Sequence, residues 1–186
     1  YLLSALPLYS LCLILSPLPS LVFCIFPFLK RYTIFSHFGV GLSLALGPLG
    51  GYFAVRPIID SSIIPVAFLT LFTWLWVSGF DIIYSTSDEE FDKREGLFSF
   101  PSRFGKSKAL QYSGFIHVIA FALLIGLYIS AFYGSIVVAV LLLLTGYLLY
   151  LEQKKADDVE LAFFKINAVL GFVVFTFVII GVELAI

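Results

Sequence analysis

Charged residues are scarce in this sequence: Asp, Glu, Lys and Arg make up only 12% of its 186 residues, whereas 61% are hydrophobic and the mean hydropathy is +1.06. Soluble domains carry about 25% charged residues, so this composition excludes an ordinary soluble domain and indicates an integral membrane protein. The formal net charge of −1 says little about partners, and we expect no nucleic acid among them.

Sulfur-containing residues are rare as well, since the sequence has two cysteines and no methionine. Cys12 and Cys24 lie in apolar runs, where a thiol usually packs as a small hydrophobe, so we expect neither a disulfide nor a metal ligand from them. The sequence begins at Tyr1 without a methionine, and its opening run has no basic region and no small-residue cleavage pattern. We therefore expect a fragment or a processed product, and not a signal peptide.

Long apolar segments are the abundant feature. A helix needs about 20 apolar residues to cross a hydrocarbon core of roughly 30 Å, and lipid offers the backbone no hydrogen-bond partner outside the segment. The sequence therefore predicts an all-α, polytopic transmembrane bundle with six spans: 8–29, 38–55, 63–84, 109–131, 135–151 and 161–185. Residues 1–7 are expected to be the end of an earlier helix.

The basic residues sort by side when alternate loops are placed on opposite sides of the membrane. Ten of the eleven fall on one side, and only Arg56 falls on the other. Cytoplasmic loops carry an excess of Lys and Arg, so this side is expected to be cytoplasmic. The ten residues are Lys30, Arg31, Lys93, Arg94, Arg103, Lys106, Lys108, Lys154, Lys155 and Lys165.

Two acidic residues follow the third span at a helical spacing. Asp88 and Asp92 are four residues apart, so on a helix both carboxylates project from one face, where they repel each other unless a cation lies between them. Hard oxygen ligands suit Mg²⁺, which commonly also binds substrate phosphate oxygens. Four nearby basic residues are suited to the remaining phosphate charge: Lys93, Arg94, Arg103 and Lys106.

A solvated loop of mixed charge would produce the same spacing. Two neighbours favour a site: Asp81 lies inside the predicted span, where an acid is costly and usually functional, and Tyr84 follows one turn later on the same face. On spacing alone both interpretations stay open.

The segment "DIIYSTSDEEFD" (81–92) and the following "GLFSFPSRFG" (96–105) resemble the second aspartate-rich motif and the next loop of the UbiA family of intramembrane prenyltransferases. "FPFLKRYT", "HFGVGLSLALGPLGGYFAV" and "AFFKINAVLG" resemble other segments of that family in the same order, so the resemblance covers essentially the whole chain. The loop is most similar to the 4-hydroxybenzoate polyprenyltransferase branch, and in particular to its menaquinone-pathway relatives with a dihydroxynaphthoate acceptor.

The resemblance implies a fold of nine transmembrane helices with two aspartate motifs facing each other. Nothing in this chain matches the first motif, NxxxDxxxD, so residues 1–186 would be the C-terminal two thirds of one prenyltransferase domain, with the six spans as helices four to nine. On this interpretation the chain is inactive by itself.

The implied activity is Mg²⁺-dependent transfer of a polyprenyl group from polyprenyl diphosphate to an aromatic acid, hydroxybenzoate or dihydroxynaphthoate, in quinone biosynthesis. The enzyme would lie in the lipid bilayer, in a bacterial inner membrane, with its active site facing the cytoplasm. Asp88 and Asp92 would be metal ligands, and Tyr84 and Asp81 would act with them.

The remaining candidate residues would bind substrate. They are Lys30, Arg31, Lys93, Arg94, Ser99, Arg103 and Asn167. An ordinary topogenic pair would also explain Lys30 and Arg31, and a hydrogen bond between helices would explain Asn167. His37 and His117 have no partner at metal-ligand spacing, so packing or interface roles are expected for both.

Two other functions compete with this prediction. A haem or chlorophyll-type prenyltransferase of the same superfamily would share the metal chemistry and differ in its acceptor. A transporter would place ionisable groups near the membrane midplane on several helices or show an internal repeat. The acidic residues inside the predicted spans, Asp81 and Glu183, lie near span ends, which favours the enzyme.

Overall fold

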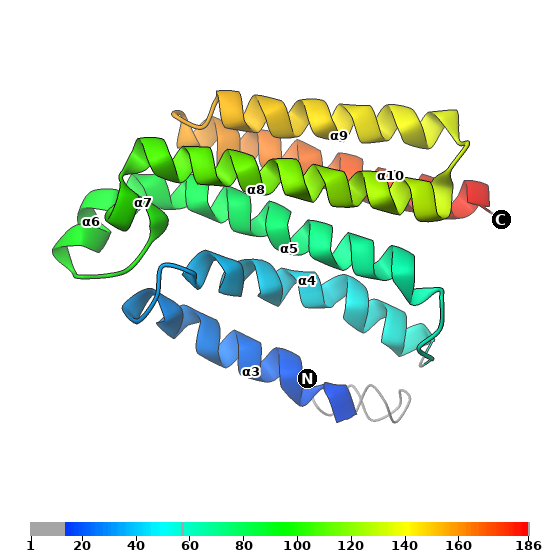
Figure 1. Ribbon diagram of the computed structural model, residues 1–186, viewed down its shortest axis with the longest axis horizontal. Coiled ribbons are helices and arrows are strands. Elements are labelled where there is room, and N and C mark those ends of the chain that lie inside the picture. Colours follow the sequence, from blue (N-terminus) through cyan, green and yellow to red (C-terminus); the bar gives the residue numbers. More distant parts are fainter. Residues whose placement is uncertain (1–13, 57, 186) are drawn as a thin grey trace.

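In the computed structural model, residues 14–56 and 58–185 are described, and every regular element among them is a helix (Figure 1). Long helices lie side by side and alternate in direction along the chain (Figure 1). They are α4 (Ser36–Val55), α5 (Ile63–Ser85), α8 (Lys106–Leu127), α9 (Ile136–Lys154) and α10 (Asn167–Ala185). The predicted all-α bundle is confirmed.

Within residues 14–56 and 58–185, five helical stretches are long and apolar enough to cross a membrane, by length and composition. Four of them match the predicted spans within a few residues at each end, and the stretch predicted as 63–84 begins where predicted but ends later, at Arg94. α8 continues into the π-helix η3 (Tyr128–Phe132), and the π-helix η4 (Glu160–Ile166) runs directly into α10. The second stretch continues past α5 through a 3₁₀ turn and a short helix to Arg94.

The first predicted span is only partly described. Its later part forms α3 (Pro17–Ile25) and the 3₁₀ helix η1 (Phe26–Arg31), whereas its beginning and the expected helix end at 1–7 lie outside the described residues. Pro17 occupies the first position of α3, where a missing N–H is tolerated. Pro27 follows two residues after α3 ends, and a proline there cannot continue the α-helical hydrogen bonds, which explains the change to η1.

The bundle is held together by apolar side chains from four helices. Phe72 of α5, Leu124 of α8, Leu142 of α9 and Phe177 of α10 belong to one buried cluster. Large apolar side chains also cover the outer surface: Phe115, Val118, Leu143 and Phe172 are each more than 60% exposed. An apolar exterior is what a lipid environment requires of helices that already satisfy their own backbone hydrogen bonds.

α4 and α5 approach each other closely. A Cβ atom at Gly41 would collide with the Ser78 hydroxyl and the Trp74 carbonyl, so only glycine permits this approach. The Trp74 indole N–H donates to the Phe38 carbonyl at 2.8 Å and fixes the register between the two helices.

The charged loops gather at one end of the bundle, on the left in Figure 1. Ion pairs join them: Lys30 lies 3.3 Å from Asp92, and Lys106 lies 3.0 Å from Asp157. This confirms that residues 85–108 lie on the same side as Lys30 and Lys154. Residues 30–36, 85–106 and 154–160 are called the charged end below.

The opposite end carries the α4–α5 connection, with one exposed ion pair between Arg56 and Asp60 at 2.7 Å. Hydrogen bonds from Ser62 and Arg56 lower the pKa of Asp60 to about 2, so this carboxylate stays ionised at neutral pH.

Candidate functional site

The acidic motif crosses three helical segments at the charged end. Asp81 lies in the next-to-last turn of α5, Asp88 ends the 3₁₀ turn η2 (Thr86–Asp88), and Asp92 lies in α6 (Glu89–Arg94). Asp88 is thus the N-cap of α6, and Asp92 lies in the first turn of that helix. The tighter turn η2 joins them to α5.

Asp92 is buried, with 1% of its side chain exposed, and it is paired with Lys30. The Lys30 ammonium lies 3.3 and 3.4 Å from the two carboxylate oxygens. Two backbone hydrogen bonds hold this arrangement: Leu97 N–H donates to the Asp92 carbonyl at 2.8 Å, and Phe98 N–H donates to the Lys30 carbonyl at 2.7 Å. The structure thus brings Lys30 from η1 directly to the motif.

Asp88 is only half-buried, and its carboxylate makes no hydrogen bond or ion pair with any described residue. Within 14–56 and 58–185 no group of three or more His, Cys, Asp or Glu side chains is placed to enclose a metal. Mg²⁺ does not require such a cage, because it typically binds one or two carboxylates and completes its shell with water and phosphate oxygens. Asp88 and Asp92 fit that partial ligand set.

Asp81 is paired with a residue that the sequence did not connect to it. Its Oδ2 lies 2.6 Å from Nδ1 of His37, which is forty-four residues earlier in the chain and lies in the first turn of α4. The His37 ring is fully buried, and its Nε2 accepts the backbone N–H of Phe100 at 3.4 Å. His37 therefore contacts both the motif and the loop that follows it.

Tyr84 packs against a different element, the π-helix η4. Its ring centroid lies 4.6 Å from that of Phe163 and 6.4 Å from that of Phe164, both in η4. Asn167 follows one turn after Phe163, and its side-chain oxygen is buried without a hydrogen-bond partner among the described residues. Tyr84 therefore contacts η4, the segment that leads to Asn167, whereas Asp81 contacts α4 through His37.

The candidate basic residues divide into paired and unpaired ones. Lys93 pairs with Glu89 at 2.5 Å, and Arg94 pairs with Glu95 at 3.4 Å while its guanidinium lies 5.5 Å from the Phe91 ring centre. Both basic side chains are exposed, where such pairs contribute little.

Arg31 and Arg103 are exposed and form no ion pair with any residue in the described part of the chain. Arg103 lies in the short helix α7 (Phe100–Phe104), whose backbone continues into α8 through Gly105 at a φ of 78°. These two guanidinium groups remain available to an anion at the charged end.

Ser99 has a structural contact that the sequence prediction did not foresee. It is the N-cap of α7: its hydroxyl accepts the Ser102 N–H at 3.2 Å, and the Ser102 hydroxyl accepts the Ser99 N–H at 2.8 Å. This reciprocal cap holds the loop helix in place. A direct contact of Ser99 with substrate stays a prediction.

A second polar network lies between α5, α8 and α9. The Gln153 amide donates to the Ser113 hydroxyl at 2.7 Å and contacts Nδ1 of His117 at 3.0 Å, and the Ser113 hydroxyl donates to the Gly79 carbonyl at 2.8 Å. Packing was expected for both histidines, and His117 fits that role. His37 differs because its partner is an acid of the motif, and no regular spacing in the sequence could have revealed a pair so far apart.

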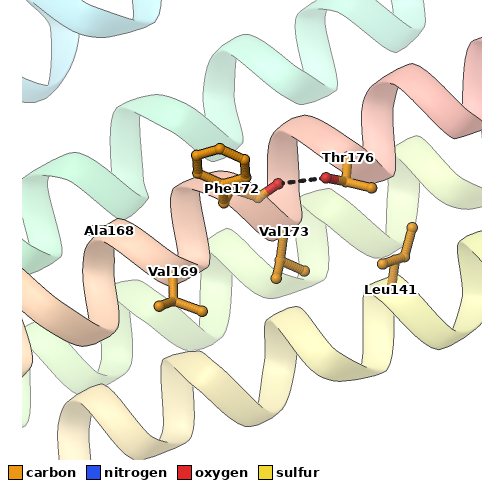
Figure 2. A pocket seen from close by; sticks show the side chains of 6 residues that line it. All are labelled: Leu141, Ala168, Val169, Phe172, Val173 and Thr176. Atoms are coloured by element: carbon orange, nitrogen blue, oxygen red, sulfur yellow. Dashed lines mark hydrogen bonds between the residues drawn. The ribbon is translucent and has the colours of Figure 1, made fainter.

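An apolar hollow of about 450 Å³ lies between α9 and α10 (Figure 2). Its lining residues are Leu141, Ala168, Val169, Phe172, Val173 and Thr176. The Thr176 hydroxyl donates to the Phe172 carbonyl of its own helix at 2.8 Å, so even this residue offers the hollow no free donor. The hollow has none of the charged groups that a diphosphate needs, and the aspartate motif lies elsewhere.

Comparison with known proteins gives consistent matches. The UbiA prenyltransferase family model matches residues 1–169. The chain is 33% identical over 113 residues to the mitochondrial 4-hydroxybenzoate polyprenyltransferase of Dictyostelium discoideum, covering 61% of this chain and 24% of that protein. It is 29% identical over 160 residues to the human protein of the same name, covering 84% of this chain and 42% of the human one.

A third relative is named for a different product. The digeranylgeranylglyceryl phosphate synthase of Methanocaldococcus jannaschii is 31% identical over 91 residues, covering 49% of this chain and 30% of that protein. Among solved structures, the apo form of a UbiA homolog from Aeropyrum pernix K1 matches with a TM-score of 0.86 and 29% identity, covering 97% of this chain and 67% of that one.

Fold and site together define a polytopic helical membrane protein with an aspartate motif at one end of its bundle. The chain belongs to the UbiA prenyltransferase family. The matched segments amount to between about a quarter and less than half of these curated relatives' own lengths.

Proposed function

We propose that the complete gene product containing this chain transfers a polyprenyl group from polyprenyl diphosphate to a hydroxylated aromatic acid in quinone biosynthesis. The observation that carries the proposal is the pair of carboxylates at the charged end: Asp92 is buried against Lys30, and Asp88, one turn earlier, has no partner among the described residues. Such a site at the end of an apolar bundle suits a substrate with a diphosphate head and a hydrocarbon tail.

Mg²⁺ bound there would supply positive charge where negative charge develops on the departing diphosphate. Asp88 and Asp92 would hold it. Lys30 balances the charge of Asp92, and the unpaired guanidinium group of Arg103 binds phosphate oxygens at the same end.

The reaction needs groups that tolerate an allylic cation. The bond between the allylic carbon and the bridging oxygen breaks, its electron pair leaves with the diphosphate, and a ring carbon of the acceptor supplies the electrons of the new bond before it loses its proton. Ring faces of Tyr84 and Phe163 attract such a cation. Arg31 holds the carboxylate of the acceptor and thereby directs one ring carbon toward the cation.

The acceptor is the finer part of this proposal. The loop "GLFSFPSRFG" favours a dihydroxynaphthoate of a menaquinone route, whereas the Dictyostelium and human relatives are named for 4-hydroxybenzoate. Both acids share an electron-rich ring and a carboxylate, so the residues described above serve either one. We propose further that the charged end faces the cytoplasm of a bacterial cell.

The test is prenyl transfer in membranes that contain the complete gene product. Membranes receive Mg²⁺ and a polyprenyl diphosphate with dihydroxynaphthoate, 4-hydroxybenzoate, haem or an isoprenyl glyceryl phosphate, each in a separate reaction. We expect product from dihydroxynaphthoate, no product after Mg²⁺ is chelated, and no product in membranes that lack the protein.

Product from 4-hydroxybenzoate alone would overturn the preference between the two acids and leave the aromatic acceptor. Product only from haem or only from the glyceryl phosphate would refute an aromatic acid acceptor altogether.

A further inference from the structure

We propose that His37 is a positioning residue of the aspartate motif: it aims the carboxylate of Asp81 and ties that acid to the loop helix α7. The activity measurements below rest on the proposed function, whereas the binding and spectroscopic measurements do not. One buried imidazole joins three elements, because His37 lies in the first turn of α4, Asp81 lies in α5 and Phe100 begins α7.

The hydrogen bonds determine which ring nitrogen carries the proton. The Phe100 backbone N–H can only donate, so Nε2 of His37 accepts and bears no hydrogen. The hydrogen of the neutral ring is then on Nδ1, which lies 2.6 Å from Asp81 Oδ2 and donates to it. Each ring nitrogen thus has one defined partner, and a flipped ring would lose both hydrogen bonds.

The surroundings prevent the ring from turning. His37 is fully buried, and its ring centroid lies 5.8 Å from that of Phe100. Phe100 contacts Phe38 and Tyr112 through ring centroids 6.5 and 5.5 Å away, and it shares a buried cluster with Ile82, the residue next to Asp81. Packing therefore holds the imidazole, and the imidazole holds the acid.

Asp81 depends on this contact for its direction. Among the described residues, His37 is the only hydrogen-bond donor to its carboxylate, and 22% of the Asp81 side chain is exposed. Asp81 lies about one helical turn before Tyr84 and two turns before Asp88. Without the imidazole, its carboxylate would be free to rotate at this place in the motif. The α7 backbone would also lose its acceptor, which loosens the helix that carries Arg103.

His117 provides a matched control in the same bundle. It is also buried, at 2% exposure, and it is also bonded through both ring nitrogens, to Gln153 and to the Trp76 carbonyl. Neither partner belongs to the aspartate motif. A substitution at His117 removes comparable packing, so the two histidines separate loss of stability from loss of positioning.

The variants are His37→Ala, His37→Gln and His117→Ala, with His37→Ala repeated in an Asp81→Ala background, all in the complete gene product. Substitution of a residue that orients the groups of a metal site typically lowers activity or metal affinity by about 10- to 100-fold. We expect His37→Ala to lower kcat and the apparent Mg²⁺ affinity by about that factor. A glutamine amide has both a donor and an acceptor, so His37→Gln should restore most of the activity.

The double variant distinguishes positioning from packing. Because His37 acts through Asp81, we expect His37→Ala to change kcat by less than about twofold when Asp81 is already alanine. His117→Ala should lower the melting temperature but leave the apparent Mg²⁺ affinity of the folded fraction unchanged. Equal losses from His37→Ala with and without Asp81, or the same Mg²⁺ effect from His117→Ala, would overturn the proposal.

Protection against thermal unfolding by Mg²⁺ with inorganic pyrophosphate tests this proposal separately from the proposed function. Thermal unfolding is measured with and without both ions, which requires no prenyl transfer. Protection of the wild type and His37→Gln but not of His37→Ala supports the positioning role, even if no acceptor is ever prenylated. Equal protection of wild type and His37→Ala contradicts it, and so does the absence of protection in the wild type.

If His37→Ala does not fold, the nitrogen-15 spectrum of labelled histidine decides. The signal assigned by His37→Gln should show a neutral ring protonated on Nδ1, and it should move in Asp81→Ala while the signal assigned by His117→Ala stays in place. A His37 signal protonated on Nε2, or one that Asp81→Ala leaves unchanged, would refute the proposal.

Discussion

Asp88 and Asp92 carry the same carboxylate in different surroundings. Asp92 is buried and paired with Lys30, whereas Asp88 is half-buried and has no partner among the described residues. A buried charge depends on its partner, because an unpaired carboxylate that has lost its water is costly. The two acids should therefore contribute equally to metal binding and unequally to stability.

The substitutions Asp88→Asn and Asp92→Asn test this difference. Each removes a hard anionic ligand at little steric cost, so both should abolish Mg²⁺-dependent prenyl transfer in the complete gene product. Asp88→Asn should change the free energy of unfolding by less than about 0.5 kcal/mol, as surface changes usually do. Asp92→Asn should lower it by about 1–2 kcal/mol, because it breaks the charged contact with Lys30.

Transfer assays and thermal unfolding in detergent measure the two effects. Near-normal turnover in both variants would show that neither carboxylate is needed for metal binding. Asp81→Asn should be milder than either, since an asparagine oxygen still accepts the hydrogen bond from His37.

At the scale of elements, the contact between α4 and α5 positions the site. α4 carries His37, α5 carries Asp81, and Gly41 and Trp74 lie where the two helices touch. The 2.6 Å pair between His37 and Asp81 forms only because the helix axes can come this close. Any group that separates the helices near Gly41 should break that pair before it unfolds the bundle.

Two glycines of α4 provide the test. A Cβ at Gly41 would meet the Ser78 hydroxyl and the Trp74 carbonyl, whereas a Cβ at Gly50 would meet nothing within 4 Å. Gly41→Ala should lower the melting temperature and the apparent Mg²⁺ affinity, because the added methyl group separates α4 from α5. Gly50→Ala should raise the free energy of unfolding by up to about 1 kcal/mol, because alanine is the better helix former. Equal effects of the two substitutions on thermal unfolding and on Mg²⁺ affinity would show that the close approach is not needed.

At the scale of the whole molecule, the two ends of the bundle differ in charge. Ten of the eleven basic residues lie toward the charged end, and Arg56 lies at the other end, where Asp60 pairs with it. The ion pairs from Lys30 and Lys106 join loops that are far apart in the sequence at this end. The arrangement places the aspartate motif at the charged end of the bundle, as the proposed binding of a diphosphate and Mg²⁺ requires.

Single cysteines introduced into a cysteine-free version of the protein report the orientation. Glu95 and Lys155 are exposed at the charged end, and Ser61 lies in the connection at the opposite end. In intact bacterial cells, a membrane-impermeant maleimide should label Ser61→Cys, and it should label Glu95→Cys and Lys155→Cys only after the cells are opened. Labelling of Glu95→Cys and Lys155→Cys from opposite sides would contradict the fold, and labelling of both from outside would reverse the proposed orientation.

Hydropathy and charge placement determine the all-α fold, five of the predicted spans and the shared side of the charged loops, because the length and polarity of each segment alone decide whether it crosses lipid. The spacing of Asp88 and Asp92 is equally local, since four residues make about one helical turn. The sequence alone therefore predicts the aspartate motif and the family, without any contact between helices.

Which side chains meet across the bundle was decided only by tertiary structure. Lys30 reaches Asp92 across sixty-two residues, His37 reaches Asp81 across forty-four, and Ser99 is occupied by its own helix cap. Such contacts depend on how closely helices pack and how they are rotated about their axes, and small residues such as Gly41 set both. No periodicity along one segment encodes the rotation of that segment against another, and the geometry around the aspartate motif therefore arises only in the folded bundle.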